Sequence, residues 1–151
     1  MSDADLTRRR LRVWLRLLRL TRGTENHLRE FLRVNHDTTL PRFDVMAALH
    51  RHDGPMKMSD LSRALLVSNG NATAVVDRLE KDGLAKRVQS ETDRRAVLVT
   101  LTTAGRTEFE AQAEAHATEI NKLFAGLDES DLDALRDIIW KIEGDDHETS
   151  A

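Results

Sequence analysis

Apolar residues recur along residues 5–34 with the spacing of one face of an α-helix. This spacing predicts one long helix, and Gly23 is where we expect it to bend. A second helix is predicted to begin at Thr38-Thr39-Leu40-Pro41, because proline suits the first turn, and to end at Asp53-Gly54-Pro55. The apolar positions of the first helix are Leu11, Trp14, Leu18, Leu28 and Leu32.

Two short helices are predicted next, in the arrangement of a helix-turn-helix. Ser59 is expected to cap the first, and Ser68 is expected to start the second, which runs to Asp82. Gly83 follows at the position expected for a left-handed residue. The inner face of the second helix is predicted to be Ala72, Val75, Val76 and Leu79.

After Gly83 the pattern changes to that of extended chain. Residues 84–88 and 96–101 are predicted as two strands, and the polar segment 89–95 as the hairpin tip between them. A helix-turn-helix followed by such a hairpin is a winged helix.

The end of the chain returns to a helical pattern. Thr102 or Thr103 is expected to cap a helix through about Ala125, and Asp128 to begin the last one. The apolar face of the last helix needs a partner, either the first helix or a second chain. Its members are Leu132, Leu135, Ile138, Ile139 and Ile142.

The predicted fold class is therefore mainly α with a small β-wing. Residues 41–102 are expected to form a winged helix-turn-helix lobe, and residues 1–40 and 103–146 a helical dimerisation region. Residues 147–151 are expected to be a flexible tail.

Composition narrows the function. The 151 residues contain no cysteine, which excludes a disulfide framework and a thiol sensor, and no apolar run long enough for a membrane span, so we expect a cytoplasmic protein without a membrane partner. The net charge is −3, yet residues 57–101 carry 8 Lys+Arg against 6 Asp+Glu, while residues 102–151 carry 4 against 13. An acidic protein can thus still present a basic face to phosphates.

The outward face of the second short helix suits the major groove of DNA. Its small, amide-rich start is expected to read bases, and Arg78 and Lys81 to hold phosphates. The hairpin tip carries Arg94 and Arg95 beside Asp93, and both arginines are predicted DNA contacts. Arg95 is expected to reach the minor groove, with Asp93 orienting it through a charge-assisted bond. The alternative is a solvated helix and turn. The predicted base-reading residues are Ser68, Asn69, Gly70, Asn71 and Thr73.

These segments resemble the MarR family of transcriptional regulators over nearly the whole chain. The run from Asp93 to Gly105 is similar to the family's wing signature, and the run from Ser68 to Leu84 to its recognition helix. The resemblance implies a homodimer whose first and last helices interlock, with Leu11 joining the apolar face of the last helix. It also implies a repressor that leaves a pseudo-palindromic operator when a small aromatic acid binds.

A narrower resemblance links residues 11–18 and 38–46 to regulators of aromatic-acid and hydroxycinnamate catabolism, some of which sense CoA thioesters. An aromatic carboxylate binds best in an apolar pocket that holds one or two fixed cations. The alternatives are ordinary core packing for the apolar residues, and pairing of the arginines with Asp44, Glu25 or Glu30. The predicted effector contacts are Trp14, Arg16, Arg42, Phe43 and Met46.

The remaining charged residues and histidines carry weaker signals. Three interpretations are open for the basic run Arg8, Arg9, Arg10 and Arg12. It forms a solvated face, contacts DNA phosphates outside the core site, or binds the phosphates of a CoA effector. The six histidines show no metal-ligand spacing, and no nucleophile is set beside a base, so we expect no metal, no cofactor and no enzyme. The alternative function is a winged-helix adaptor that binds protein. That function predicts an apolar recognition face on the second short helix.

Overall fold

The computed structural model describes residues 2–144, so the predicted tail at 147–151 lies outside the described residues. Its contacts divide the chain into two compact units, Met1–Ala115 and His116–Ala151. None of the helices within residues 2–144 is both long and apolar enough to cross a membrane.

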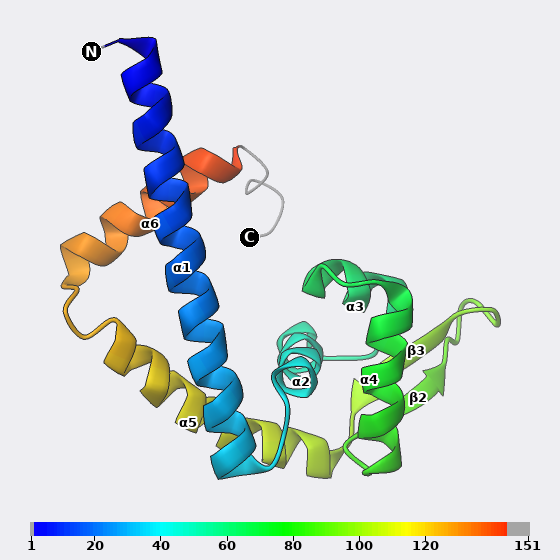
Figure 1. Ribbon diagram of the computed structural model, residues 1–151. Helices are drawn as coiled ribbons and strands as arrows, with labels where there is room; N and C mark the ends of the chain where they lie inside the picture. The colour runs from blue at the N-terminus through cyan, green and yellow to red at the C-terminus, as the bar shows by residue number, and fades with distance from the viewer. Residues whose placement is uncertain (1, 145–151) are drawn as a thin grey trace. The chain divides into compact units, whose positions relative to one another are not determined.

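The first helix, α1, spans Asp3–His36 and continues through Gly23 (Figure 1). It begins at a capping box, in which the Ser2 side chain accepts from the backbone N–H of Asp5 and the Asp5 side chain from that of Ser2. Only its last turns are buried, at Leu28 and Leu32. The long helix expected from the sequence is therefore confirmed, with one end packed on the lobe.

Helix α2 spans Leu40–His52 and starts as predicted. Thr39 Oγ1 accepts from the backbone N–H of Arg42 at 3.3 Å, and proline occupies the first turn. The helix ends at Asp53, which has a left-handed backbone. Its length places Phe43 and Met46 in the core of the lobe.

Helices α3 (Met58–Leu65) and α4 (Asn69–Lys81) form the helix-turn-helix. The prediction that Ser59 caps α3 is wrong, because the helix already begins at Met58 and its N-cap, Lys57, makes no side-chain capping bond. Ser68 does cap α4, since its Oγ accepts from the backbone N–H of Asn71 at 3.1 Å.

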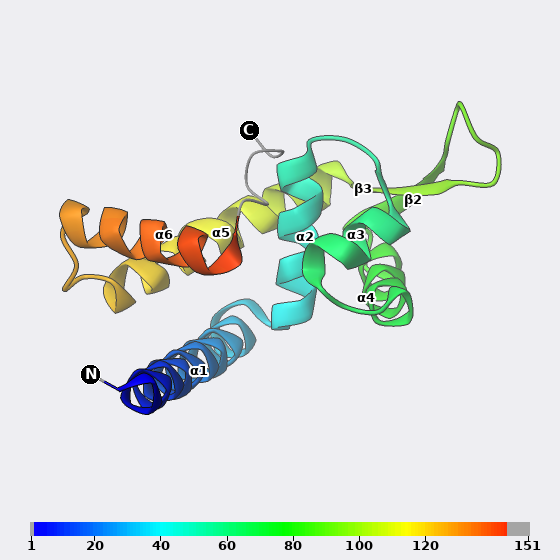
Figure 2. The ribbon, with the colours of Figure 1, turned by 90° about the horizontal axis from the view of Figure 1, so that it is seen from above.

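The sheet has three strands in the order β1-β3-β2. Strands β2 (Ala85–Gln89) and β3 (Val97–Leu101) are the predicted hairpin, paired from Ala85 opposite Leu101 to Gln89 opposite Val97. The sequence pattern did not reveal β1 (Met56–Lys57), which pairs antiparallel with β3. The hairpin extends beyond the sheet as a wing (Figure 2).

One hydrophobic core holds the lobe together. It joins α2, α3, α4 and the sheet, and the end of α1 contributes Leu32. Burial of such side chains stabilises the fold by about 1.5–3 kcal/mol each. Its most deeply buried members are Leu32, Met46, Leu61, Leu79, Val45, Val76 and Val99.

Helix α5 spans Thr103–Leu123 and is anchored to the wing at its start. Thr102 Oγ1 donates to the carbonyl of Gly83 at 2.7 Å and accepts from the backbone N–H of Gly105 at 3.0 Å. Gly105 is required there, because a Cβ on it would lie 1.8 Å from the carbonyl oxygen of Leu84. In the second unit, α6 spans Glu129–Glu143 and begins at the predicted cap, Asp128.

Candidate nucleic-acid interface

Helix α4 divides into a buried line, an exposed line and two flanks. Ala72, Val76 and Leu79 are buried in the core, whereas Val75 is only half-buried. At 100° per residue, the line opposite the buried one consists of Gly70, Ala74 and Lys81. All three are exposed, so the surface of α4 farthest from the core is narrow and ends in a cation.

The start of α4 is fixed by two side chains that were predicted to read bases. Ser68 uses its hydroxyl oxygen as the helix cap, and Asn69 Oδ1 accepts a hydrogen bond from Ser62 of α3. These two bonds position the start of the helix. Asn71 is exposed, while Thr73 is half-buried on the flank nearer the wing.

Arg87 of β2 ties the wing to α4. Its guanidinium lies 2.6 Å from Asp77 Oδ1 and 3.3 Å from Glu80 Oε1, and its backbone N–H donates to Glu80 Oε2 at 3.0 Å. The hydrogen bond to Asp77, with the charges of Asp77 and Glu80, raises the pKa of Arg87 despite partial burial. The same contacts neutralise two carboxylates on the outer flank of α4, which favours approach of a polyanion.

The wing tip is ordered by its own side chains. Asp93 Oδ1 accepts from the backbone N–H of Arg95 at 3.0 Å, and Ser90 Oγ accepts from that of Asp93 at 3.2 Å. Asp93 thus shapes the backbone of the tip, whereas the expected bond to the arginine side chain is not formed. Within residues 2–144, the guanidinium groups of Arg94 and Arg95 have no ion-pair partner and both residues are exposed.

The five residues predicted to bind an effector are not brought together as one slot. Phe43 and Met46 are 6% and 1% exposed in the core, where Phe43 packs 5.5 Å from Phe109 between ring centres. Arg42 lies 2.7 Å from Asp82, a partner that the sequence did not suggest. Trp14 and Arg16 remain exposed on α1.

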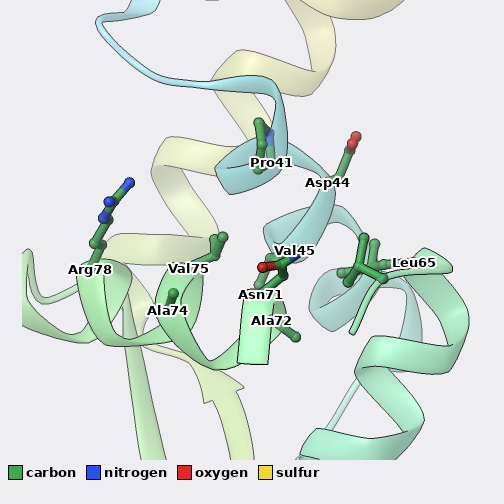
Figure 3. Close-up of a pocket in the computed structure, with 10 residues that line it drawn as sticks. Pro41, Asp44, Val45, Leu65, Asn71, Ala72, Ala74, Val75 and Arg78 are labelled. Carbon is green, nitrogen blue, oxygen red and sulfur yellow. The ribbon is translucent and has the colours of Figure 1, made fainter. Parts of the chain in front are cut away.

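A cavity of about 330 Å³ lies between α2 and α4 instead (Figure 3). Arg78 is the cation among the residues that line it, and Asp44 is the carboxylate. Partial burial, with the charge of Glu25, raises the pKa of Asp44. The other lining residues are mostly apolar: Pro41, Val45, Leu65, Val67, Asn71, Ala72, Ala74 and Val75.

Most of the residues predicted to form a dimer are exposed in the single chain. Leu11 of α1 is 57% exposed, and no residue of α6 is buried. Leu135 is half-buried, and the other four residues of the predicted face are exposed, Ile142 at 70%. Neither helix therefore satisfies its apolar face within the part of the chain that the structure describes.

A helix-turn-helix with a cationic wing defines the winged-helix class of proteins. The MarR family model matches residues 38–97. The HTH-type transcriptional regulator YfiV of Bacillus subtilis is 33% identical over 103 residues, which are 68% of this chain and 62% of that protein. The chain thus spans less than two thirds of that relative's length. It belongs to the MarR family.

Two solved structures extend the likeness. A mutant MarR from E. coli, complexed with operator DNA, is 26% identical, with a TM-score of 0.74 over 84% of this chain and 91% of that one. BpsR of Bordetella bronchiseptica, whose DNA binding is regulated by 6-hydroxynicotinic acid, is 26% identical, with a TM-score of 0.72 over 85% and 97%.

Proposed function

We propose that the chain is a homodimeric transcriptional regulator, a repressor that binds a pseudo-palindromic operator and leaves it when a small aromatic acid or its CoA thioester binds. The observation that carries the proposal is the surface formed by the exposed line of α4 and the wing arginines. Gly70 and Ala74 let the helix backbone approach bases, and Lys81 lies at its end. Arg95 extends the surface toward the minor groove.

The dimer supplies the spacing that this surface needs. Two recognition helices must lie about 34–36 Å apart to read successive major grooves. The proposed dimer interface consists of the exposed apolar faces of α1, which includes Leu11, and of α6, which includes Ile142. A regulator of this kind would bind one half-site weakly and two half-sites tightly.

The cavity between α2 and α4 is the proposed effector site. An aromatic ring fits between its apolar walls, and a carboxylate would pair with Arg78. Because Arg78 is also the proposed phosphate contact, effector and DNA would compete for one cation. By linkage, the effector lowers DNA affinity by the same factor as DNA lowers effector affinity. The regulation of BpsR by 6-hydroxynicotinic acid supports an acid of this class.

DNA binding is tested by fluorescence anisotropy on a duplex selected from random sequence. Arg95→Ala should weaken binding by about 10-fold and lower the salt slope by about one unit. Arg51→Ala, which removes an exposed cation of α2, is the matched control and should leave both unchanged. Equal affinity of the wild type and Arg95→Ala would contradict the wing assignment.

The effector is tested by thermal shift without DNA, using benzoate, hydroxycinnamates, 6-hydroxynicotinate and their CoA thioesters. A binding acid should raise the Tm of the wild type and of Lys81→Gln, but not of Arg78→Gln, because Lys81 does not line the cavity. A shift that survives Arg78→Gln would place the effector elsewhere. No shift with any compound would remove the effector and leave the DNA-binding proposal standing.

A further inference from the structure

Helix α1 carries a charge pattern that the operator contact does not use. Residues 6–24 contain seven arginines, no lysine and no acidic residue. All seven arginines are exposed. Arginine without lysine is typical of phosphate recognition, because its planar fork binds phosphate oxygens bidentately.

Five of these arginines share one side of the helix. At 100° per residue, they fall within a sector of about 100° and extend about 16 Å along the axis. Within residues 2–144, Arg12, Arg16 and Arg19 make no hydrogen bond or ion pair through their side chains, and Arg8 lies 3.7 Å from Asp5. We call this set the arginine stripe: Arg8, Arg9, Arg12, Arg16 and Arg19.

The arginine stripe is separate from the α4 and wing surface. The part of α1 that packs into the core of the lobe lies around Leu32. At 1.5 Å per residue, Arg19 lies about 20 Å and Arg8 about 36 Å along the helix from Leu32. The stripe therefore lies on a length of α1 that extends beyond the lobe core.

The shape of the stripe selects its ligand. Small anions such as nucleotides bind in concave sites, and the cavity between α2 and α4 is not lined by a residue of α1. A convex row of cations about 16 Å long suits an extended polyanion instead. A DNA strand carries one phosphate per about 3.4 Å of duplex axis, so about five phosphates span the same length as five arginines.

We propose that the arginine stripe is a second, sequence-independent binding surface for duplex DNA, so that a dimer held on its operator can hold another DNA segment. The apolar side of α1 is already assigned to the proposed dimer, which leaves it unavailable for insertion into a lipid bilayer. The acidic α6 is a poorer partner for the stripe, because Asp133 and Asp137 lie 2.9 and 3.1 Å from Arg136.

The test is capture of a second duplex by operator-bound protein. The selected operator duplex is immobilised, the full chain is loaded, and a fluorescent 60-base-pair duplex of unrelated sequence is added over a range of salt. The stripe variant is Arg12→Gln/Arg16→Gln/Arg19→Gln. The control, Arg10→Gln/Arg29→Gln/Arg51→Gln, removes three exposed arginines that lie outside the stripe.

The stripe variant should load on the operator like the wild type but capture the second duplex at least 10-fold more weakly. Its salt slope for capture should fall by about 2.7, the value for three phosphates. The control should capture normally. Capture that is unchanged in the stripe variant, or that is abolished by Arg95→Ala in protein still loaded on the operator, would overturn the proposal.

Two further outcomes would also overturn it. If the stripe variant sediments as a monomer where the wild type is a dimer, the stripe belongs to the subunit interface. If the wild type binds vesicles of phosphatidylserine and phosphatidylcholine through the stripe but captures no second duplex, its ligand is a lipid surface. If the wild type fails to load on the operator duplex, that result contradicts the proposed function and not the stripe. The stripe would then be tested by comparing how free wild type and free stripe variant capture the duplex of unrelated sequence.

Discussion

Gly70→Ala separates the stability of α4 from its contact with DNA. Gly70 is the second residue of α4, and a Cβ built on it meets no atom closer than Ser68 Oγ at 4.0 Å. Alanine is favoured over glycine in a helix by up to about 1 kcal/mol, and less near the helix start. We therefore expect the free energy of unfolding of the variant to be about 0.5–1 kcal/mol higher than that of the wild type, which raises Tm by about 2 °C.

The same methyl group should weaken DNA binding. Gly70 lies on the exposed line of α4, where the absence of a side chain lets the backbone approach bases. An extra methyl in a close-packed interface costs about 1–3 kcal/mol, and 1.4 kcal/mol corresponds to a tenfold loss of affinity. Calorimetry should therefore show a higher Tm for Gly70→Ala, whereas anisotropy should show about 10-fold lower affinity for the selected duplex.

Gly23→Ala is the matched control. Gly23 is also helical, a Cβ added to it would meet no atom within 4 Å, and it lies on α1, outside the proposed DNA-binding surface of α4 and the wing. This variant should gain stability without losing affinity. If Gly70→Ala gains stability and binds the duplex as tightly as the wild type, the exposed line of α4 does not face DNA.

Of three other substitutions, two test the packing around this surface and the third tests the burial of His116 in the second unit. Gly105→Ala should lower Tm by about 6–12 °C, because its Cβ would lie 1.8 Å from the carbonyl oxygen of Leu84 and moving the backbone to relieve this clash costs about 3 kcal/mol. The control, Gly126→Ala, should leave Tm unchanged, because its Cβ would meet no atom within 4 Å. An equal Tm for the two variants would contradict the packing of Gly105 on Leu84. Arg87→Ala should cost about 1–2 kcal/mol in denaturant unfolding and weaken DNA binding further, because it frees two carboxylates beside the helix; an unchanged affinity would contradict the clamp. Burial lowers the pKa of His116, so the unfolded chain binds more protons below about pH 6.5 and stability falls as pH falls; His116→Gln should lose less Tm between pH 7.5 and 5.5, and an equal loss would exclude this cause.

Local signals in the sequence were sufficient for most of the fold. Helix starts were predicted within Thr38-Thr39-Leu40-Pro41 and at Ser68 and Asp128, because a capping side chain acts within three residues of its own position. The hairpin followed from alternation over five-residue strands. Strand β1 was missed because two residues, Met56 and Lys57, are too few to show a period, and the same extended pair displaced the start of α3 from Ser59.

The site was less predictable because its geometry depends on contacts between distant residues. The sequence indicates that Asn69 is polar and lies at a helix start, but not that Ser62 donates to it. The ion pair between Arg42 and Asp82 joins two helices forty positions apart. A signal for Arg87 did exist, since Asp77 and Glu80 are three positions apart on the helix that precedes its strand.

The central claim is that two copies of the α4 and wing surface read DNA together. In vitro selection from random duplexes with the full chain, followed by sequencing and a footprint on the enriched DNA, tests it most directly. The account predicts an inverted repeat whose half-sites are centred about one helical turn apart, with enrichment lost in Arg95→Ala. Enrichment of a single half-site without symmetry, or of the same sequences by Arg95→Ala, would contradict it.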